Sequence, residues 1–225
     1  MSAKKEIENI ISSISGKYSP YEVFSDWIRA CAISVQNQCV FFHDKTWEKR
    51  EQTYKDTVRR YTDPEVEKFA EMFVLLGDAL TEQMEDVLGS VYMEMGMGSK
   101  TTGQFFTPFH LSELTSTMSI HDSIKSFDGK MTLLNEPSCG GGGMIIAAAK
   151  TYLDHGINPQ KYLRILAQDL DWKAVYMCYL QLSLLGLKAT VVQGDTLCEP
   201  YKKGYPADRV MRTPAEMGLE MRLFV

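Results

Sequence analysis

Four consecutive glycines constrain the fold of this chain more than any other sequence feature. They occupy positions 140–143, between a short apolar segment and a run of isoleucines and alanines at positions 145–149. This order predicts a β-strand, a glycine turn and an α-helix. A backbone without Cβ atoms can approach a ligand closely, and the first amides of the helix offer donors to a nucleotide-type cofactor or a phosphate. The alternative is a tight turn that needs positive φ angles and binds nothing.

Established glycine motifs narrow the choice of ligand. A P-loop ends in Gly-Lys-Ser/Thr, but the next lysine, Lys150, lies two turns into the predicted helix, which excludes a triphosphate. In the dinucleotide pattern G-x-G-x-x-G, Ile145 takes the third glycine position, and this bulky side chain weakens the case for NAD. A nucleophile elbow needs glycine two residues before Cys139, where Pro137 stands, so a catalytic thiol in that geometry is not expected.

Strand and helix patterns alternate through the second half of the chain. Helices are predicted at 108–120, 143–155 and 172–185, and strands at 131–134, 163–167 and 189–193. Such alternation predicts a parallel sheet with crossover helices, and ligands of such sheets bind beyond the carboxyl ends of the strands. Asp169 and Asp195 follow the second and third strands, so we expect both carboxylates at that edge, while Asp171 caps the next helix.

The first half of the chain shows helical patterns only. Asp63 is the expected N-cap of a helix with Pro64 in its first turn, and apolar residues then recur at spacings of three and four from Val66 to Val91. Residues 21–39 also read as a helix with one apolar side. A glycine-rich stretch follows near position 98. We therefore expect a helical region at 1–98, packing without chemistry of its own, and a cofactor-binding domain at 99–225.

Composition excludes several classes of protein. The 225 residues are 44% hydrophobic and carry a net charge of -5, so the overall balance does not attract nucleic acid. Five cysteines without a C-x-x-C pair predict reduced thiols in a cytoplasm, and the four histidines form no metal-binding pattern. No apolar stretch approaches the roughly 20 residues of a membrane span, and no secretory signal opens the chain. We expect a cytoplasmic protein without a metal or membrane site.

Four motifs in order, "GQFFTP", "EPSCGGGGM", "AQDLD" and "GDTL", resemble the amino-methylating DNA methyltransferases. The resemblance is greatest to the methylation subunit of type I restriction-modification systems, and it covers roughly residues 103–197. The helical N-terminal region also resembles that subunit. The resemblance implies an α/β, Rossmann-like S-adenosylmethionine-dependent methyltransferase fold, with an incomplete parallel sheet preceded by a helical region.

The same resemblance implies which residues hold the cofactor S-adenosylmethionine. The family pattern D-P-x-C-G-x-G-G corresponds to positions 136–143, with glutamate in place of aspartate, and implies contacts to the methionine part. Asp169 matches the acid that binds the ribose, and Asp195 matches the acid that recognises the adenine amino group. The implied binding residues are Gln104, Phe105, Phe106, Thr107 and Pro108, which close over the cofactor, and Glu136, Pro137, Ser138, Cys139, Gly140, Gly142, Asp169, Leu170, Asp195 and Thr196.

The catalytic signature of the family, N-P-P followed by Tyr or Phe, does not occur in this sequence. It is expected at the end of a fourth strand, where the chain reads "ADRVMRTPAEMG". Pro214 stands in register there, but Arg212 and Thr213 replace what a flipped base would need, so no catalytic residue is assigned. We therefore expect an S-adenosylmethionine-binding relative that has lost methyl transfer. The alternative is an active adenine-N6 DNA methyltransferase completed by another chain or segment.

The expected partners follow from the incomplete sheet. Contact with DNA is expected only together with a partner, which would be a specificity or methyltransferase subunit or a second copy of this chain. The remaining strands of such a fold are absent before Val225, so we expect the tail or a second copy to cover an open sheet edge. The tail also carries four cations, Lys202, Lys203, Arg209 and Arg212. These cations could form a phosphate-contacting loop, or, given the acids nearby, the tail could be an ordinary solvated loop.

Overall fold

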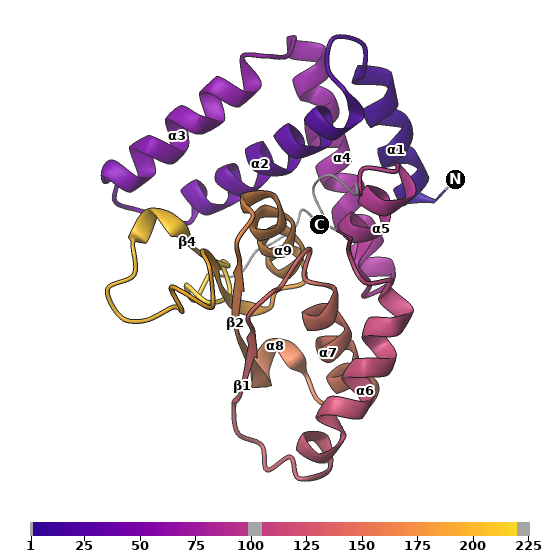
Figure 1. The fold of residues 1–225 in the computed structure, drawn as a ribbon, viewed down its shortest axis with the longest axis vertical. Helices are drawn as coiled ribbons and strands as arrows, with labels where there is room; N and C mark the ends of the chain where they lie inside the picture. Colours follow the sequence, from indigo (N-terminus) through magenta and orange to yellow (C-terminus); the bar gives the residue numbers. More distant parts are fainter. Residues whose placement is uncertain (1, 99–104, 220–225) are drawn as a thin grey trace.

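The computed structural model describes residues 2–98 and 105–219. Its first part is helical, as the sequence predicts. The helices are α1 (Ala3–Ile14), α2 (Pro20–Gln38), α3 (Lys45–Val58), α4 (Asp63–Glu82) and α5 (Val87–Glu94). They form the upper part of the molecule in Figure 1, where α2 and α3 extend to one side and α1, α4 and α5 lie on the other.

The long helix predicted from Val66 to Val91 is wrong, because the structure divides it into α4 and α5. Gln83 is extended (φ -146°, ψ 126°), and Asp86 begins α5 by accepting the backbone N–H of Gly89 at 2.8 Å. The N-cap of α4 is also one residue earlier than predicted. Thr62 takes this place in a capping box with Glu65.

The second part is an α/β unit with a small sheet. Its strands are β1 (Thr132–Glu136), β2 (Leu163–Asp169), β3 (Lys188–Gln193) and β4 (Val210–Arg212), and its helices are α6 (Phe109–Lys125), α7 (Gly143–Asp154), α8 (Pro159–Tyr162) and α9 (Trp172–Leu184). The strand order is β1-β2-β3-β4, and the first three strands are parallel. The predicted α/β fold with a small parallel sheet is therefore confirmed.

The two edges of the sheet are treated differently. The short strand β4 pairs antiparallel with β3, so the tail covers that edge, which is one of the two outcomes expected from the sequence. Along the outer edge of β1, by contrast, no strand pairs within the described part of the chain. The side chain of Leu133 on this strand is 77% exposed. Unpaired edge strands with exposed apolar side chains are open to pairing with another chain.

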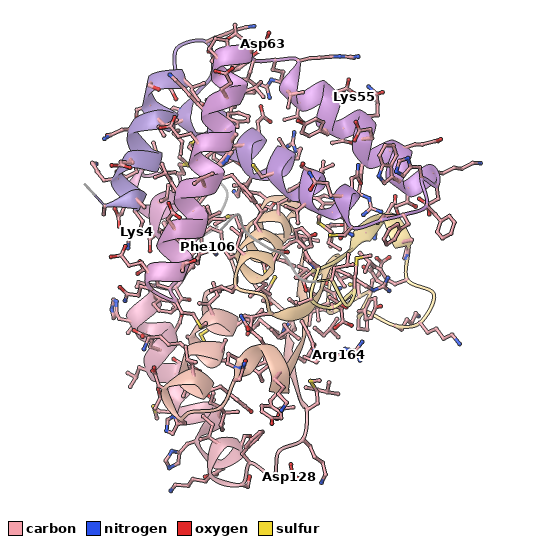
Figure 2. All side chains as sticks on the ribbon, turned by 180° about the vertical axis from the view of Figure 1, so that it is seen from behind. Lys4, Lys55, Asp63, Phe106, Asp128 and Arg164 are labelled. Atoms are coloured by element: carbon pink, nitrogen blue, oxygen red, sulfur yellow. The ribbon has the colours of Figure 1, made fainter. Side chains whose placement is uncertain are left out.

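One continuous core joins the helical part to the sheet. Trp27, Tyr92, Tyr152 and Tyr179 are fully buried in it. Phe106 lies near the middle of the molecule, and its ring contacts that of Tyr92 at a centroid distance of 5.1 Å (Figure 2). The proposed boundary between positions 98 and 99 borders residues outside the described ranges and stays a prediction. No helix in the described ranges is long and apolar enough to cross a membrane.

Candidate functional site

A crevice of about 400 Å³ lies at the carboxyl ends of β1, β2 and β3. This is the edge at which parallel α/β sheets bind ligands, and the volume lies in the range of small-molecule sites. Three loops, one after each strand, and the segment before α6 form its walls. The lining residues are Phe105, Phe106, Pro137, Ser138, Gly140, Asp169, Leu170, Gly194, Asp195, Thr196 and Leu197.

Gly140 is the residue of the glycine run that lines the crevice. Its φ angle is +52°, in the left-handed region that favours glycine, and its backbone N–H donates to Asp169 Oδ2 at 2.9 Å. A Cβ atom added to Gly140 would lie only 3.1 Å from Cδ1 of Phe106. The bare backbone therefore lets the turn, the strand β2 and the Phe106 ring meet at one side of the crevice.

The other three glycines face the protein interior. Gly142 is the N-cap of α7 with a φ of +97°, and an added Cβ would lie 3.3 Å from Cys178 Sγ. Added Cβ atoms on Gly141 and Gly143 would lie 3.1 Å from Met177 Cε and 2.9 Å from an Asp86 carboxylate oxygen, respectively. The glycine run therefore combines both sequence interpretations, with one residue at the crevice and three in a tightly packed turn.

A buried polar network supports the turn from its inner side. Gln181 on α9 donates from Nε2 to Asp86 Oδ1 and to the carbonyl oxygen of Gly141, both at 2.8 Å, and its Oε1 accepts the N–H of Leu88 at 3.1 Å. Gln181 is 0% exposed and Asp86 is 3% exposed, and burial raises the pKa of the Asp86 carboxyl. Sequence reasoning did not find this pair. The sequence feature that could have indicated this pair is a glutamine among the apolar residues of α9.

Asp169 connects the turn to the end of β2. Its Oδ2 accepts the N–H of Gly140, and its Oδ1 accepts the N–H of Asp171 at 3.0 Å. Its own carbonyl oxygen accepts the N–H of Gly194 at 2.8 Å. Each carboxylate oxygen has two acceptor positions, so each keeps one after these bonds. Asp169 can therefore hold the loop and still accept hydrogen bonds from a ligand hydroxyl.

Asp195 presents a second carboxylate to the crevice from the end of β3. Its Oδ1 accepts the backbone N–H groups of Leu197 at 2.9 Å and Cys198 at 3.2 Å. A hydrogen bond from the Cys198 side chain and these backbone bonds lower the pKa of Asp195. The neighbouring Thr196 hydroxyl donates to the carbonyl oxygen of Pro137 at 2.6 Å and so joins the β3 loop to the β1 loop. Asp195 thus remains an ionised acceptor on a braced loop.

Apolar side chains flank the two carboxylates. Phe105, Leu170 and Leu197 line the crevice and are 57%, 67% and 94% exposed. Large exposed apolar side chains beside two carboxylate acceptors suit a ligand that has a flat ring with polar groups on its edge. Gly194 and Leu197 were not among the predicted binding residues. Both belong to the "GDTL" motif, so the signal for them was present.

Several predicted binding residues do not line the crevice. Glu136 lies outside the lining, and its side chain accepts the Ser138 N–H at 3.1 Å. Thr107 and Pro108 also lie outside the lining, and Pro108 is the N-cap of α6. Cys139 is buried, and a hydrogen bond with Cys178 together with burial raises its thiol pKa well above the usual value. The remaining residues in this group are Gly142, which faces Cys178, and Gln104, which falls outside the described residues.

The degenerate catalytic window lies at the opposite end of the sheet. Because β4 runs antiparallel to β3, Arg212 pairs with Thr190 near the amino end of β3. Thr213 is 0% exposed, donates to the carbonyl oxygen of Leu187 at 2.7 Å and accepts the N–H of Ala189 at 3.0 Å. The window therefore does follow a fourth strand, as predicted, but this strand runs away from the crevice. Arg212, Thr213 and Pro214 do not line the crevice.

Among the described residues, no group of three or more histidine, cysteine, aspartate or glutamate side chains is placed to hold a metal ion. The geometry of the crevice is instead that of an organic ligand site, with two carboxylates, a bare backbone and apolar walls.

Comparisons with known proteins give a family, and the solved structures similar to this chain include two methyltransferases. The model of the family described as N-6 DNA Methylase matches residues 77–215, more than half of the chain. A protein from Listeria monocytogenes assigned to the class I S-adenosylmethionine-dependent methyltransferases is 13% identical with a TM-score of 0.45, over 87% of this chain and 54% of that one. The methyltransferase subunit of a type I restriction-modification system from Streptococcus thermophilus is 15% identical with a TM-score of 0.46, over 91% and 60%. This chain thus spans little more than half of either protein.

Proposed function

Because the chain belongs to the N-6 DNA methylase family, we propose that it binds S-adenosylmethionine in the crevice at the carboxyl ends of β1, β2 and β3. One observation carries this proposal. Two carboxylates on neighbouring strand ends, Asp169 and Asp195, line the same crevice as the left-handed Gly140. Acids at this position in α/β sheets bind the hydroxyl groups of a ribose, and a bare backbone admits the attached chain.

The residues present fit the nucleoside half of this cofactor. Asp169 keeps one acceptor position on each oxygen, which suits the two hydroxyl groups of a ribose. Asp195 is an acceptor that suits the amino group of adenine, and its lowered pKa keeps it ionised in neutral solution. Leu170 and Leu197 offer apolar surface to the faces of the ring.

The loop after β1 fits the amino-acid half. We assign Gly140 and Ser138 to the methionine part, since both line the crevice beside Pro137. Glu136 precedes them outside the crevice lining, and its Oε1 orders the loop by accepting the Ser138 N–H. S-adenosylmethionine, when bound, supplies a methyl group attached to a positively charged sulfur.

We further propose that this chain does not transfer the methyl group on its own. Methylation of a base in DNA requires a flipped nucleotide held by hydrogen bonds and by stacking on an aromatic ring. Arg212 and Thr213, in the window where those groups are expected, pair with the amino end of β3. The chain then acts as a cofactor-binding member of an adenine-N6 DNA methylation system.

Calorimetric titration with S-adenosylmethionine tests the proposal, with NADH titrated in parallel. We expect saturable binding of S-adenosylmethionine and none of NADH. Asp169→Asn removes an acceptor from the ribose position and should weaken binding by about tenfold, the effect of losing one charge-assisted hydrogen bond. Asp128→Asn is the matched control, because Asp128 bonds only Lys130 in an exposed turn. Equal affinities of the two variants would refute the assignment of the crevice.

A second candidate function is methyl transfer completed by another chain, and the unpaired edge of β1 favours it. The loop that follows this strand lines the crevice at Pro137 and Ser138, and Leu133 on the strand is largely exposed. A specificity subunit, a methyltransferase subunit or a second copy would pair with β1, and DNA would bind to the assembly. The test is transfer of a labelled methyl group to adenine-containing DNA, with and without lysate of the host. Incorporation by the purified chain alone would instead disprove the proposal that it is inactive by itself.

A further inference from the structure

A second crevice, here called the basic crevice, lies between α3 and the segment that carries β4. It consists of two adjoining cavities of about 430 and 440 Å³, which share Thr46, Arg50 and Val210 in their linings. In Figure 1 the β4 segment, in yellow, lies beside the end of α3 at which that helix begins. The salt bridge between Lys49 Nζ and Asp208 Oδ2, at 2.7 Å, connects the two walls. None of these residues lines the proposed cofactor crevice.

The lining of the basic crevice has a charge opposite to that of the whole protein. Six cations and two acids, Asp44 and Asp208, line it. The lining therefore has an excess of four positive charges, in a chain with a net charge of -5. Clefts lined mainly by one sign of charge concentrate ligands of the opposite sign. The six cations are Lys49, Arg50, Lys202, Lys203, Arg209 and Arg212.

Arg50 is the central cation, and within the described residues no ion pair holds it, although Asp44 and Asp208 act on it at longer range. Its Nε donates only to the carbonyl oxygen of Thr46, one turn earlier in α3, at 3.4 Å. In the described ranges, no carboxylate lies within ion-pair distance of Arg50, whereas Lys49 pairs with Asp208 and Arg209 with Glu199. Burial is also the main cause of a lowered Arg50 pKa. A half-buried cation without a partner costs free energy that a bound anion would offset.

An aromatic wall lies across the crevice from α3. Trp172 and Tyr176 of α9 stack at a centroid distance of 5.1 Å and an interplanar angle of 26°, and both line the same cavity as Arg50. The amide of Gln193 completes this wall and donates to the carbonyl oxygen of Leu170 at 2.8 Å. Unpaired cations that face stacked aromatic rings are the elements with which proteins bind nucleotides through both phosphate and base.

We propose that the basic crevice binds a nucleoside phosphate, with the phosphate on Arg50 and the base against Trp172 and Tyr176. The ligand is either a free nucleotide or one unit of a nucleic-acid strand, since both present the same chemistry. The cavity of about 430 Å³ is large enough for a group of this size. The site is separate from the cofactor crevice, so its existence does not depend on binding of S-adenosylmethionine.

Tryptophan fluorescence and calorimetry provide the test. The probes are thymidine monophosphate and a short oligothymidylate, which lack the adenine expected in the cofactor crevice. Stacking of a base should quench Trp172, because Trp27 is fully buried and Trp47 is stacked on His43 outside this cavity. Trp172→Phe should abolish the quenching, while calorimetry still detects binding.

Two arginine variants, one within α3 and one at its C-cap, decide the role of Arg50. Arg50→Gln should weaken binding by about tenfold, the effect of losing a charge-assisted contact to phosphate. Arg59→Gln is the matched control and should leave the affinity within about twofold, since Arg59 is exposed and pairs weakly with Asp56. Circular dichroism of each variant checks that the helices form.

The two probes distinguish the sources of the ligand. Tight, salt-dependent binding of the oligothymidylate, with a salt slope that falls by about one in Arg50→Gln, identifies a nucleic-acid strand. Saturable binding of thymidine monophosphate with similar affinity identifies a free nucleotide. No saturable binding of either probe, or equal affinities of Arg50→Gln and Arg59→Gln, would overturn the proposal. Asp169→Asn should leave both titrations unchanged, which separates this result from the outcome at the cofactor crevice.

Discussion

The glycine turn between β1 and α7 has two faces that differ in solvent access and in partners. On the crevice face, Gly140 meets the half-buried Asp169 and the ring of Phe106. On the inner face, Gly141 and Gly143 meet the fully buried Gln181 and Asp86. The difference teaches that most of a glycine run beside a ligand site can be required by packing. A substitution on the inner face should therefore affect stability first, and one on the crevice face should affect binding first.

The largest effect that would test this contrast is expected for Gln181→Leu. The change leaves the Gly141 carbonyl and the Leu88 N–H without partners in the interior, and among the described residues Asp86 keeps only the N–H of Gly89. We expect a loss of about 3–5 kcal/mol in the free energy of unfolding, since each unsatisfied buried group costs about 1–3 kcal/mol. Urea denaturation measures it. Gln52→Leu on the exposed side of α3 is the control, and similar losses in both variants would contradict a specific role for the network.

Gly142→Ala should have the next largest effect. The residue has a φ of +97°, and its new Cβ would approach Cys178 Sγ to 3.3 Å. We expect a loss of about 2 kcal/mol, from left-handed strain together with crowding. Gly129→Ala separates the two causes, because Gly129 has a φ of +81° and nothing within 4 Å of an added Cβ. If the two variants lose equal stability in urea, crowding on the inner face is unimportant.

Asp86→Asn should produce a smaller change that depends on pH. Burial raises the pKa of Asp86 above its ordinary value of 3.8, so ionisation of this carboxyl costs the folded state free energy. Such a group stabilises the folded protein at pH values below its pKa in the unfolded chain. This stabilisation is lost as the pH rises through the pKa of the group in the folded protein. Because asparagine cannot ionise, the variant should be the more stable protein at neutral pH. Its advantage should shrink as the pH falls toward 3.8, and a constant difference in urea midpoint across this range would contradict the prediction.

The smallest effect on stability is expected for Phe105→Ala on the crevice face. Phe105 is 57% exposed, so the free energy of unfolding should change by less than about 0.5 kcal/mol. Affinity for S-adenosylmethionine should nevertheless fall about fivefold in calorimetry, through loss of aromatic contact. Phe42→Ala, an exposed phenylalanine outside the crevice, should change neither quantity. A large stability loss in Phe105→Ala would remove the distinction between the two faces.

Local patterns predicted most of the elements and part of the site. The alternating segments from 131 to 193 place β1, α7, β2, α9 and β3 in order, because each combines a clear periodicity with its own turn. Asp169 and Asp195 reach the crevice because parallel strands bring their carboxyl ends to one edge. Such residues are predictable since strand direction alone decides where they lie.

The features that sequence reasoning missed depend on distant contacts. The apolar spacing continues unbroken from Leu80 to Val87, so periodicity does not separate α4 from α5, although Asp86 is a local N-cap. The antiparallel strand β4 is held in part by Gln36, whose side-chain oxygen accepts the Arg212 N–H at 2.8 Å across 176 residues of sequence. The bond between Gln181 and Asp86 likewise joins residues 95 positions apart. Periodicity and capping rules contain no information about such pairs.

The position of Gln181 also has a consequence for the order of synthesis. The carbonyl group of Gly141 leaves the ribosome 40 residues before the side chain that satisfies it, and Asp86 leaves it 95 residues before. Non-local contacts form late, because loop closure must precede them. A nascent chain that ends before α9 therefore holds the glycine turn without its inner support. Ligand binding should begin only after α9 has been translated, which makes the crevice one of the last parts of the protein to mature.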